Sequence, residues 1–331
     1  MKKIAVMLLT MVLVLSLVSP TLAQGPAVNA RVTSLEFPDA YILTEMVDSK
    51  QIKISPDGEK ISITGVSDET QDYMRDVIID NPELRNTLIT NKGQIARIVS
   101  ATVFVEEEYK VVGDDVVITN SRLLSQEEVE AIGISNFTDL ASQKVEISPQ
   151  SVAGNSRGKL SITFTCNTLS DSNYAAKYQL KGKASWSGFD TVYNSTNNPA
   201  VGEDFFGFAW GGDLTSTSPS ASATWNGGGS QSIYMSDAAA NAGTVWSFEE
   251  FRGGAYMIYV SPANIGLTIQ KKVLTGNGNT TQAILKYIHT YQTVSGSISI
   301  TANSSGVGSG FTLSSTSKQW SIVCTMSNIA Y

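Results

Sequence analysis

The chain has 331 residues, of which 42% are hydrophobic and only 16% are charged. One histidine and two cysteines are too few for a four-ligand Cys/His zinc site, and a net charge of −7 without a basic stripe disfavours nucleic acid as a partner. Low charge together with 8% aromatic residues is typical of an ordered protein.

Residues 1–23 have the pattern of a secretory signal peptide. Two lysines precede an apolar run from Ile4 to Val18, and small residues follow up to Ala23, where we expect cleavage. The run is shorter than the roughly 20 residues that a membrane-spanning helix needs, although an uncleaved anchor is the alternative. The sequence therefore predicts a secreted, extracellular protein with no transmembrane segment after signal cleavage.

The charge changes near residue 150. Residues 24–150 hold 11 basic and 22 acidic residues, whereas residues 151–331 hold 10 and 8 and contain all five tryptophans. We predict an acidic α+β domain over 24–147, a linker over 148–158 that is rich in Ser, Gly and Asn, and an aromatic- and Gly-rich domain over 159–331. For the acidic domain we expect a partner-binding or pro-region role.

The first domain mixes strand and helix signals. Residues 51–64 alternate apolar and polar on both sides of Pro-Asp-Gly, which predicts a hairpin. Ser67 is placed to cap a helix that runs to about residue 80, and residues 96–105 are typical of a strand. Ser125-Gln-Glu-Glu is a capping box, and Gly133 is a natural end for the short helix that it begins.

The second domain has the pattern of an all-β fold. Only residues 236–242 look helical, and glycine-rich turns separate the other segments. This pattern predicts a mainly β protein with a C-terminal antiparallel β-sandwich, in a jelly-roll-like or barrel arrangement. Strands are expected at residues 159–167, 174–186, 205–210, 243–248, 255–260, 267–274, 282–293, 297–301 and 319–326.

Both cysteines lie in segments that resemble strands, near the start and the end of the second domain. A bridge between Cys166 and Cys324 would close a long loop, for which the chain-entropy model gives about 4–5 kcal/mol of stabilisation. Export permits such a bridge, so we predict a disulfide, with two buried thiols as the alternative.

The densest group of chemically capable residues lies between positions 186 and 213. Tryptophan faces combined with carboxylates are typical of sites that bind sugars. The alternative is a sandwich core, because Phe206, Phe208 and Trp210 share one face of a strand. The predicted ligand-binding residues are Trp186, Asp190, Glu203, Asp204, Trp210 and Asp213.

No cofactor is expected, with calcium as the open alternative. Four of the same acids (Asp190, Glu203, Asp204 and Asp213) are enough oxygen ligands, but their spacing matches no calcium loop.

Catalysis without histidine would need a pair of carboxylates. Glu203 and Glu249 could serve a glycoside hydrolase if the fold brings them together, whereas Glu249 and Glu250 point to opposite faces of a strand. His289 lies between Tyr287 and Tyr291 with no acid or nucleophile nearby in sequence, so we expect a partly buried ring in an aromatic ladder.

Residues 296–317 alternate small polar and apolar side chains, as a hairpin that inserts into membranes does. A pore-forming toxin is therefore a further alternative. The leading hypothesis is a secreted, non-enzymatic protein whose sandwich binds a carbohydrate, cell-wall or cell-surface ligand. It depends on the aromatic excess of the second half and the absence of a complete catalytic constellation.

Overall fold

The structure is a computed structural model, and the residues that it describes are 30–57, 59–79, 85, 88–89, 96–112, 115–137, 153–169, 171–188, 202–252, 258–273, 280–291, 296–302, 309–315 and 318–330. The predicted signal peptide at residues 1–23 lies outside these residues.

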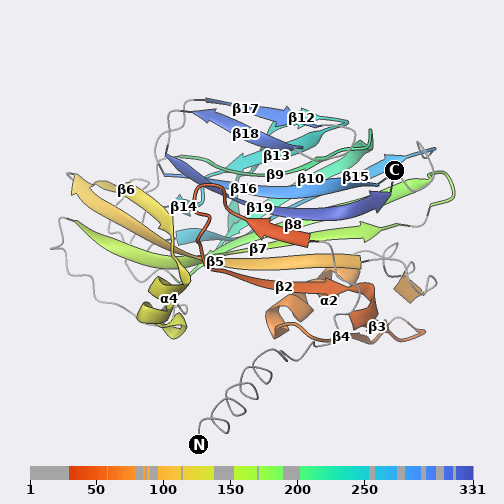
Figure 1. The fold of residues 1–331 in the computed structure, drawn as a ribbon, viewed down its shortest axis with the longest axis horizontal. Helices are drawn as coiled ribbons and strands as arrows, with labels where there is room; N and C mark the ends of the chain where they lie inside the picture. Colours follow the sequence, from red (N-terminus) through yellow and green to blue (C-terminus); the bar gives the residue numbers. More distant parts are fainter. Residues whose placement is uncertain are drawn as a thin grey trace, which may run out of the picture.

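Two antiparallel sheets stack face to face (Figure 1). The six-stranded sheet has the order β1-β19-β16-β9-β13-β12. The nine-stranded sheet has the order β11-β10-β15-β8-β7-β5-β2, with β6 beside β5 and β14 beside β15. The prediction of an antiparallel β-sandwich is confirmed.

The six-stranded sheet consists of β1 (Ala30–Thr33), β19 (Gln319–Ala330), β16 (Thr280–Thr290), β9 (Asp204–Trp210), β13 (Gly243–Phe248) and β12 (Tyr234–Ala239). The nine-stranded sheet consists of β11 (Ser230–Gln231), β10 (Thr215–Trp225), β15 (Ile258–Lys271), β14 (Phe251–Arg252), β8 (Ala176–Ser187), β7 (Ala153–Thr168), β5 (Ala96–Val112), β6 (Asp115–Leu123) and β2 (Ile42–Asp48).

The main core lies between the two sheets, and β8 shows how the sequence builds it. Every second residue of β8 is buried, from Ala176 to Trp186, while the residues between are partly exposed. This period of two is expected of a strand with one face on the core and one in solvent. Phe164 and Phe208 meet across the core with ring centroids 5.9 Å apart, so aromatic residues from both sheets fill this layer.

A short hairpin of β17 (Gly296–Thr301) and β18 (Gly310–Ser315) covers the outer face of the six-stranded sheet (Figure 1). Phe311 and Leu313 of this hairpin are buried against Phe205, Val245 and Ile288. Its strands have six residues each, fewer than the 9–11 that a membrane-crossing strand needs. The segment expected in the toxin alternative therefore packs on the protein itself.

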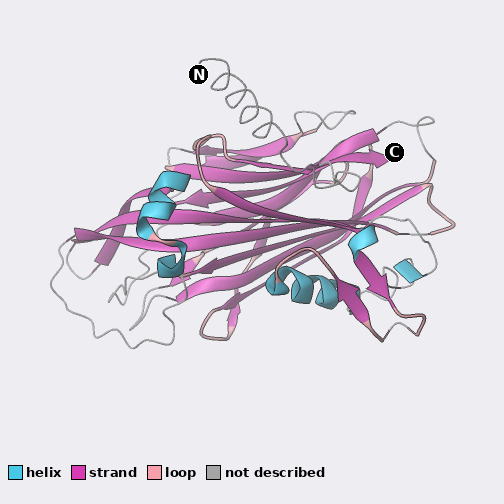
Figure 2. Cartoon of the chain, turned by 60° about the horizontal axis from the view of Figure 1, so that its bottom comes forward, coloured by secondary structure: helices cyan, strands magenta, loops and turns pink. Residues whose placement is uncertain are grey.

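The outer face of the nine-stranded sheet carries α2 (Asp68–Ile79) and the hairpin of β3 (Ile52–Ile54) and β4 (Ile61–Ile63). Met74 and Ile78 of α2 pack with the sheet residue Ile98 in a second buried cluster. Figure 2 shows the helices on this side of the molecule. The predicted hairpin and the helix that follows Ser67 are both confirmed.

The remaining helices whose bounds lie within the described residues are short. They are η1 (Ser49–Gln51), α4 (Gln126–Ile132) and η2 (Ile134–Phe137). The predicted capping box at Ser125 and Glu128 is present, and Gly133 ends α4 with a positive φ of 85°.

The predicted linker does not separate two sheets. Residues 153–158 belong to β7, which pairs with β5 along its length from Ala96↔Asn167 to Lys110↔Ala153. Strands from both sides of the predicted boundary therefore share the nine-stranded sheet, and β1 pairs with β19 in the other. The predicted helix at residues 236–242 is wrong, because residues 234–239 form β12.

The predicted disulfide is wrong, because Cys166 and Cys324 are free thiols. Cys166 lies on β7 of the nine-stranded sheet and Cys324 on β19 of the six-stranded sheet, and both are buried in the main core. Each packs there as a small apolar side chain. Burial raises the pKa of both thiols to about 12.

Candidate functional site

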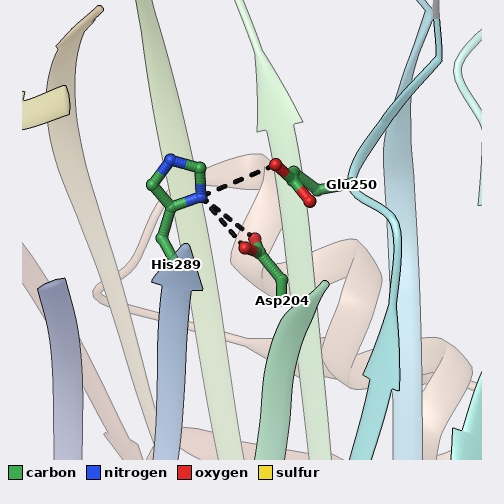
Figure 3. Close-up of side chains that lie close together, drawn as sticks. All are labelled: Asp204, Glu250 and His289. Atoms are coloured by element: carbon green, nitrogen blue, oxygen red, sulfur yellow. Dashed lines mark hydrogen bonds and ion pairs between the residues drawn. The ribbon is translucent and has the colours of Figure 1, made fainter. Parts of the chain in front are cut away.

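Two groups of polar side chains stand out, one inside the sandwich and one on its outer face. The inner group, here called the buried cluster, consists of Glu107, Asp204, Glu250 and His289. None of the four has measurable exposure to solvent. Figure 3 shows the carboxylates of Asp204 and Glu250 pointing toward one ring nitrogen of His289.

The period of two of the strands places these residues in the core. Asp204 and His289 lie two positions from a buried aromatic residue of the same strand, so they face the core as that residue does, and Glu250 lies two positions beyond the last buried aromatic residue of β13. Each of these residues therefore lies at the end of a row of apolar core residues, at one end of the sandwich. The pairs are Asp204 with Phe206, Glu250 with Phe248 and His289 with Tyr287.

His289 is the centre of the buried cluster. Its Nδ1 lies 3.0 Å from Oδ1 of Asp204 and 3.9 Å from Oε1 of Glu250. Its Nε2 lies 3.3 Å from Oε1 of Glu107. Three carboxylates thus surround one imidazole inside the protein.

Further donors hold Asp204 in place. The backbone N–H of Thr290 donates to Oδ1 of Asp204 at 2.9 Å, and the hydroxyl of Tyr287 donates to Oδ2. The Tyr287 hydroxyl in turn accepts a hydrogen bond from Nε1 of Trp186 at 2.8 Å. Asp204 therefore receives donors from the backbone, a phenol and the imidazole.

The carboxylates of Glu107 and Glu250 do not receive hydrogen bonds of this kind. Neither oxygen of either carboxylate has a hydrogen bond within the part of the chain that the structure describes, and Nε2 of His289 also lacks one of good geometry. Glu106, beside Glu107 on β5, instead accepts from Arg122 and Arg157. The two arginines therefore neutralise the outer residue of this adjacent pair.

The electrostatics of the buried cluster favour bound protons or another cation. Burial raises the pKa of Glu250 well above its ordinary value, and the nearby charge of Asp204 raises it further. Burial alone would lower the pKa of His289, but Asp204, Glu107 and Glu250 outweigh it and raise the pKa well above its ordinary value. The imidazole is therefore charged at neutral pH unless another cation replaces its proton.

The expectation that His289 has no acidic partner is wrong. Asp204 is distant in sequence, but β9 and β16 are neighbouring strands, and their last register pair is Phe205↔Ile288. One more step along both strands brings Asp204 beside His289. The signal in the sequence was one titratable residue on each of the two strands, β9 and β16, at a position that faces the core.

The predicted ligand-binding residues do not form one surface. Trp186 and Trp210 are buried, and Nε1 of Trp210 donates to the carbonyl of Leu214 at 2.7 Å. Their predicted role as stacking surfaces is wrong, because their faces pack in the core. Asp204 belongs to the buried cluster, and Asp190 lies outside the described residues.

The remaining two predicted residues lie far apart. Glu203 and Asp213 are both exposed, but they flank opposite ends of β9, a distance of about 20 Å or more. The proposed set of calcium ligands is therefore not assembled. Glu203 and Glu249, the proposed hydrolase pair, are both exposed just beyond the register pair Asp204↔Phe248.

The second group is a groove of about 610 Å³ on the outer face of the nine-stranded sheet. Helix α2 forms one wall with Tyr73 and Asp76. The floor crosses β8, β15 and β10, which are adjacent strands. Its lining is mostly small and polar, and includes Lys183, Asn264 and Ser222.

The groove floor is part of a longer row of polar side chains, here called the polar row. The register pairs are Ser222↔Asn264, Asn264↔Lys183, Lys183↔Thr163, Thr163↔Ser100 and Ser100↔Glu45. They connect six neighbouring strands, so the row extends about 24 Å across the sheet. The hydroxyls of Ser100 and Thr163 are hydrogen bonded at 3.1 Å.

Tyr73 lies over the middle of the polar row. The ammonium of Lys183 is 5.1 Å from the centre of the Tyr73 ring. On the other side of this contact is a second groove of about 280 Å³, which includes Glu45, Ser100 and Thr163 of the polar row. The two grooves share Tyr73 and Lys183 and form one polar path across the sheet.

Comparisons with known proteins identify no family. No family model matches the sequence, and no curated protein matches significantly. Among solved structures, the C-terminal domain of the AgI/II polypeptide BspA of Streptococcus agalactiae matches with 6% identity, over 70% of this chain and 92% of that domain. The TM-score is 0.22.

The described helices are also informative about membranes. None of them has both the length and the apolar character needed to cross a bilayer.

Proposed function

We propose that the protein is an extracellular binding module that holds an extended polysaccharide or glycan of a cell wall or cell surface along its polar row. The observation that carries this proposal is the continuous line of hydroxyl, amide, ammonium and carboxylate groups over six strands, which runs through two grooves. Register partners share one face of a sheet, and here the polar row lies at the base of a concave surface.

The chemistry of the polar row suits a ligand rich in hydroxyl groups. Serine and threonine hydroxyls both donate and accept, and the amide of Asn264 does the same through separate atoms. Sugar hydroxyls have the same double capacity, so contacts with these hydroxyl and amide groups can form in either direction, whereas Lys183 donates and the Glu45 carboxylate accepts. Tyr73 adds an aromatic ring at the centre, where the apolar face of a sugar can pack.

The site replaces the one that the sequence indicated. The tryptophans of the second half stabilise the core, so aromatic content alone did not locate a binding surface. The polar row supports the same class of ligand through hydrogen bonds.

The proposal is tested by binding of the full mature chain to a panel of immobilised polysaccharides and to bacterial cell-wall preparations. Lys183→Ala and Asn264→Ala should each weaken binding by about fivefold, since one hydrogen bond is worth about 1 kcal/mol and 1.4 kcal/mol is a factor of ten. Lys272→Ala is the matched control, because Lys272 is an exposed lysine outside both grooves.

Two results would overturn this function. The first is the absence of binding across the panel and the cell-wall preparations. The second is binding that Lys183→Ala and Asn264→Ala leave unchanged, which would place the ligand on another surface.

Glycoside hydrolysis is a second candidate, supported by one specific observation. Glu203 and Glu249 are exposed at the same end of the paired strands β9 and β13. Two such carboxylates can act as acid and as nucleophile or base. Release of reducing ends from a bound polysaccharide, lost in Glu203→Gln and in Glu249→Gln, would support it, and unaltered polysaccharide after prolonged incubation would exclude it.

A further inference from the structure

The buried cluster contains more negative charge than its protein partners neutralise. Glu107, Asp204 and Glu250 contribute three carboxylates, and the protonated ring of His289 contributes one positive charge at most. The neighbouring arginines, Arg122 and Arg157, form ion pairs with Glu106 instead. Buried carboxylates in proteins are paired, protonated or bound to a metal ion.

The unsatisfied atoms of the cluster point to the same place. Both oxygens of Glu250 are buried without a hydrogen bond in the described structure, and the carboxylate points toward Nδ1 of His289 (Figure 3). Asp204 reaches the same nitrogen from the neighbouring strand. The three side chains thus converge from β9, β16 and the segment after β13.

The distances are those of ligands around a single ion. One nitrogen of His289 and one oxygen each of Asp204 and Glu250 lie within 4.8 Å of one another, and the two distances from Nδ1 are 3.0 and 3.9 Å. Ligand atoms that are each about 2.1 Å from a metal ion are roughly 3–4 Å apart. Only small side-chain movements would be needed to surround an ion.

The groups around the ligands also match those of metal sites, with Glu107 within reach of Nε2 of His289 but without a hydrogen bond of good geometry in the described structure. A histidine that binds metal through one ring nitrogen usually donates from the other to a carboxylate, and Glu107 lies 3.3 Å from Nε2. Ligating carboxylates are usually held by further donors, and Asp204 receives the Tyr287 hydroxyl and the Thr290 N–H.

We propose that Asp204, Glu250 and Nδ1 of His289 bind one divalent transition-metal ion, with Glu107 orienting the imidazole. One nitrogen and two carboxylate ligands without a thiolate suit Zn²⁺, Mn²⁺ or Fe²⁺, whereas Ca²⁺ and Mg²⁺ prefer sites made only of oxygen. The ion has a structural role: it joins β9 and β16 of the six-stranded sheet to the segment between β13 and β14, at one end of the core, where Trp186 and Trp320 pack against the imidazole. Because the ligands are buried, the ion enters as the chain folds.

The test is to refold the full mature chain from denaturant with Zn²⁺, Mn²⁺, Fe²⁺ (under anaerobic conditions) or EDTA, and to measure bound metal after gel filtration. We expect about one equivalent of metal per chain and a higher melting temperature than in EDTA. Glu250→Gln and Asp204→Asn should lose most of the metal. The adjacent exposed residues give matched controls, so Glu249→Gln and Glu203→Gln should retain it.

A spectroscopic measurement keeps the test decisive if a variant fails to fold. Chain refolded with Co²⁺ should show visible absorption bands of a bound ion, and Zn²⁺ added during refolding should abolish them. The proposal is overturned if folded wild-type chain holds less than a tenth of an equivalent of every metal offered and melts at the same temperature in EDTA. Equal metal content in Glu250→Gln and Glu249→Gln would also overturn it.

Discussion

The interior and the surface of the sandwich use acidic residues in opposite ways. At three places the chain has two adjacent acids, one directed outward and one into the core. The outer member either is exposed or is paired with arginine, whereas the inner member has no measurable exposure. The pairs are Glu106 with Glu107, Glu203 with Asp204, and Glu249 with Glu250.

This contrast shows that position along a strand, not residue type, decides what a carboxylate does. A one-residue shift in register would exchange the members of every pair. The two exposed outward acids, Glu203 and Glu249, keep their hydration, so their loss changes little, whereas Glu106 is paired with two arginines. The inward acids have lost their hydration, and their partners determine the stability of that end of the core.

The largest effect is expected at the Glu203 and Asp204 pair. Asp204→Asn should lower the free energy of unfolding by about 3–5 kcal/mol, because it disrupts a buried network of Tyr287, His289 and a backbone N–H. Glu203→Gln should change it by about 0.5 kcal/mol or less. Denaturant unfolding of both variants measures the difference, and equal losses would contradict the distinction between inner and outer acids.

The second largest effect comes from a comparison of substitutions on the two faces of β8. A Cβ at Gly182 would lie 2.8 Å from a side-chain carbon of Leu285 and 3.0 Å from one of Phe206, so Gly182→Ala should destabilise by about 1–3 kcal/mol. Lys183→Ala, on the outer face, should weaken ligand binding and leave stability within about 1 kcal/mol. Thermal unfolding and polysaccharide binding of both variants test this. Binding unaffected by Lys183→Ala, or normal stability in Gly182→Ala, would contradict the assignment.

A smaller effect depends on pH and concerns Glu106. Burial raises the pKa of this carboxyl, but hydrogen bonds from Arg122 and Arg157 outweigh burial and lower it below the ordinary value. The ionised form therefore stabilises the fold at pH above about 4.3, and this contribution is lost as the pH falls through the lowered pKa. Glu106→Gln should cost about 1–2 kcal/mol at pH 7.

The check is urea unfolding of the wild type and of Glu106→Gln between pH 7 and pH 3. The difference between the two should narrow steadily below about pH 4.3. A constant difference over this range would show that Glu106 contributes through packing and not through its charge.

Much of the fold could be predicted from local sequence patterns. The hairpin of β3 and β4, the capping box at Ser125 and the strands around the core follow from turn residues, caps and a period of two. These features depend on neighbouring residues. The pairing of β5 with β7 could not be predicted from such local patterns. The charge composition changes between these two strands, although both belong to the same sheet.

The candidate sites were harder to predict, because they too depend on contacts between residues that are distant in sequence. Asp204 and His289 are far apart in sequence and meet only through the register of β9 and β16. Likewise the polar row depends on the register of six strands, and each strand contributes a single unremarkable serine, threonine, asparagine, lysine or glutamate. The tryptophans gave the strongest local signal, and they proved to be part of the core.

The smallest effect is expected when reductant is added. It tests whether Cys166 and Cys324 are two buried thiols or one covalent crosslink. A disulfide between Cys166 and Cys324 would contribute about 4–5 kcal/mol, whereas free thiols make stability independent of reductant. The melting temperature should therefore be the same with and without dithiothreitol, and alkylation in denaturant without reductant should label both residues. In the folded chain, burial and the raised pKa of about 12 should make alkylation at pH 8 very slow. A chain in which neither cysteine is labelled in denaturant until reductant is added would contradict the packing of two separate thiols in the core.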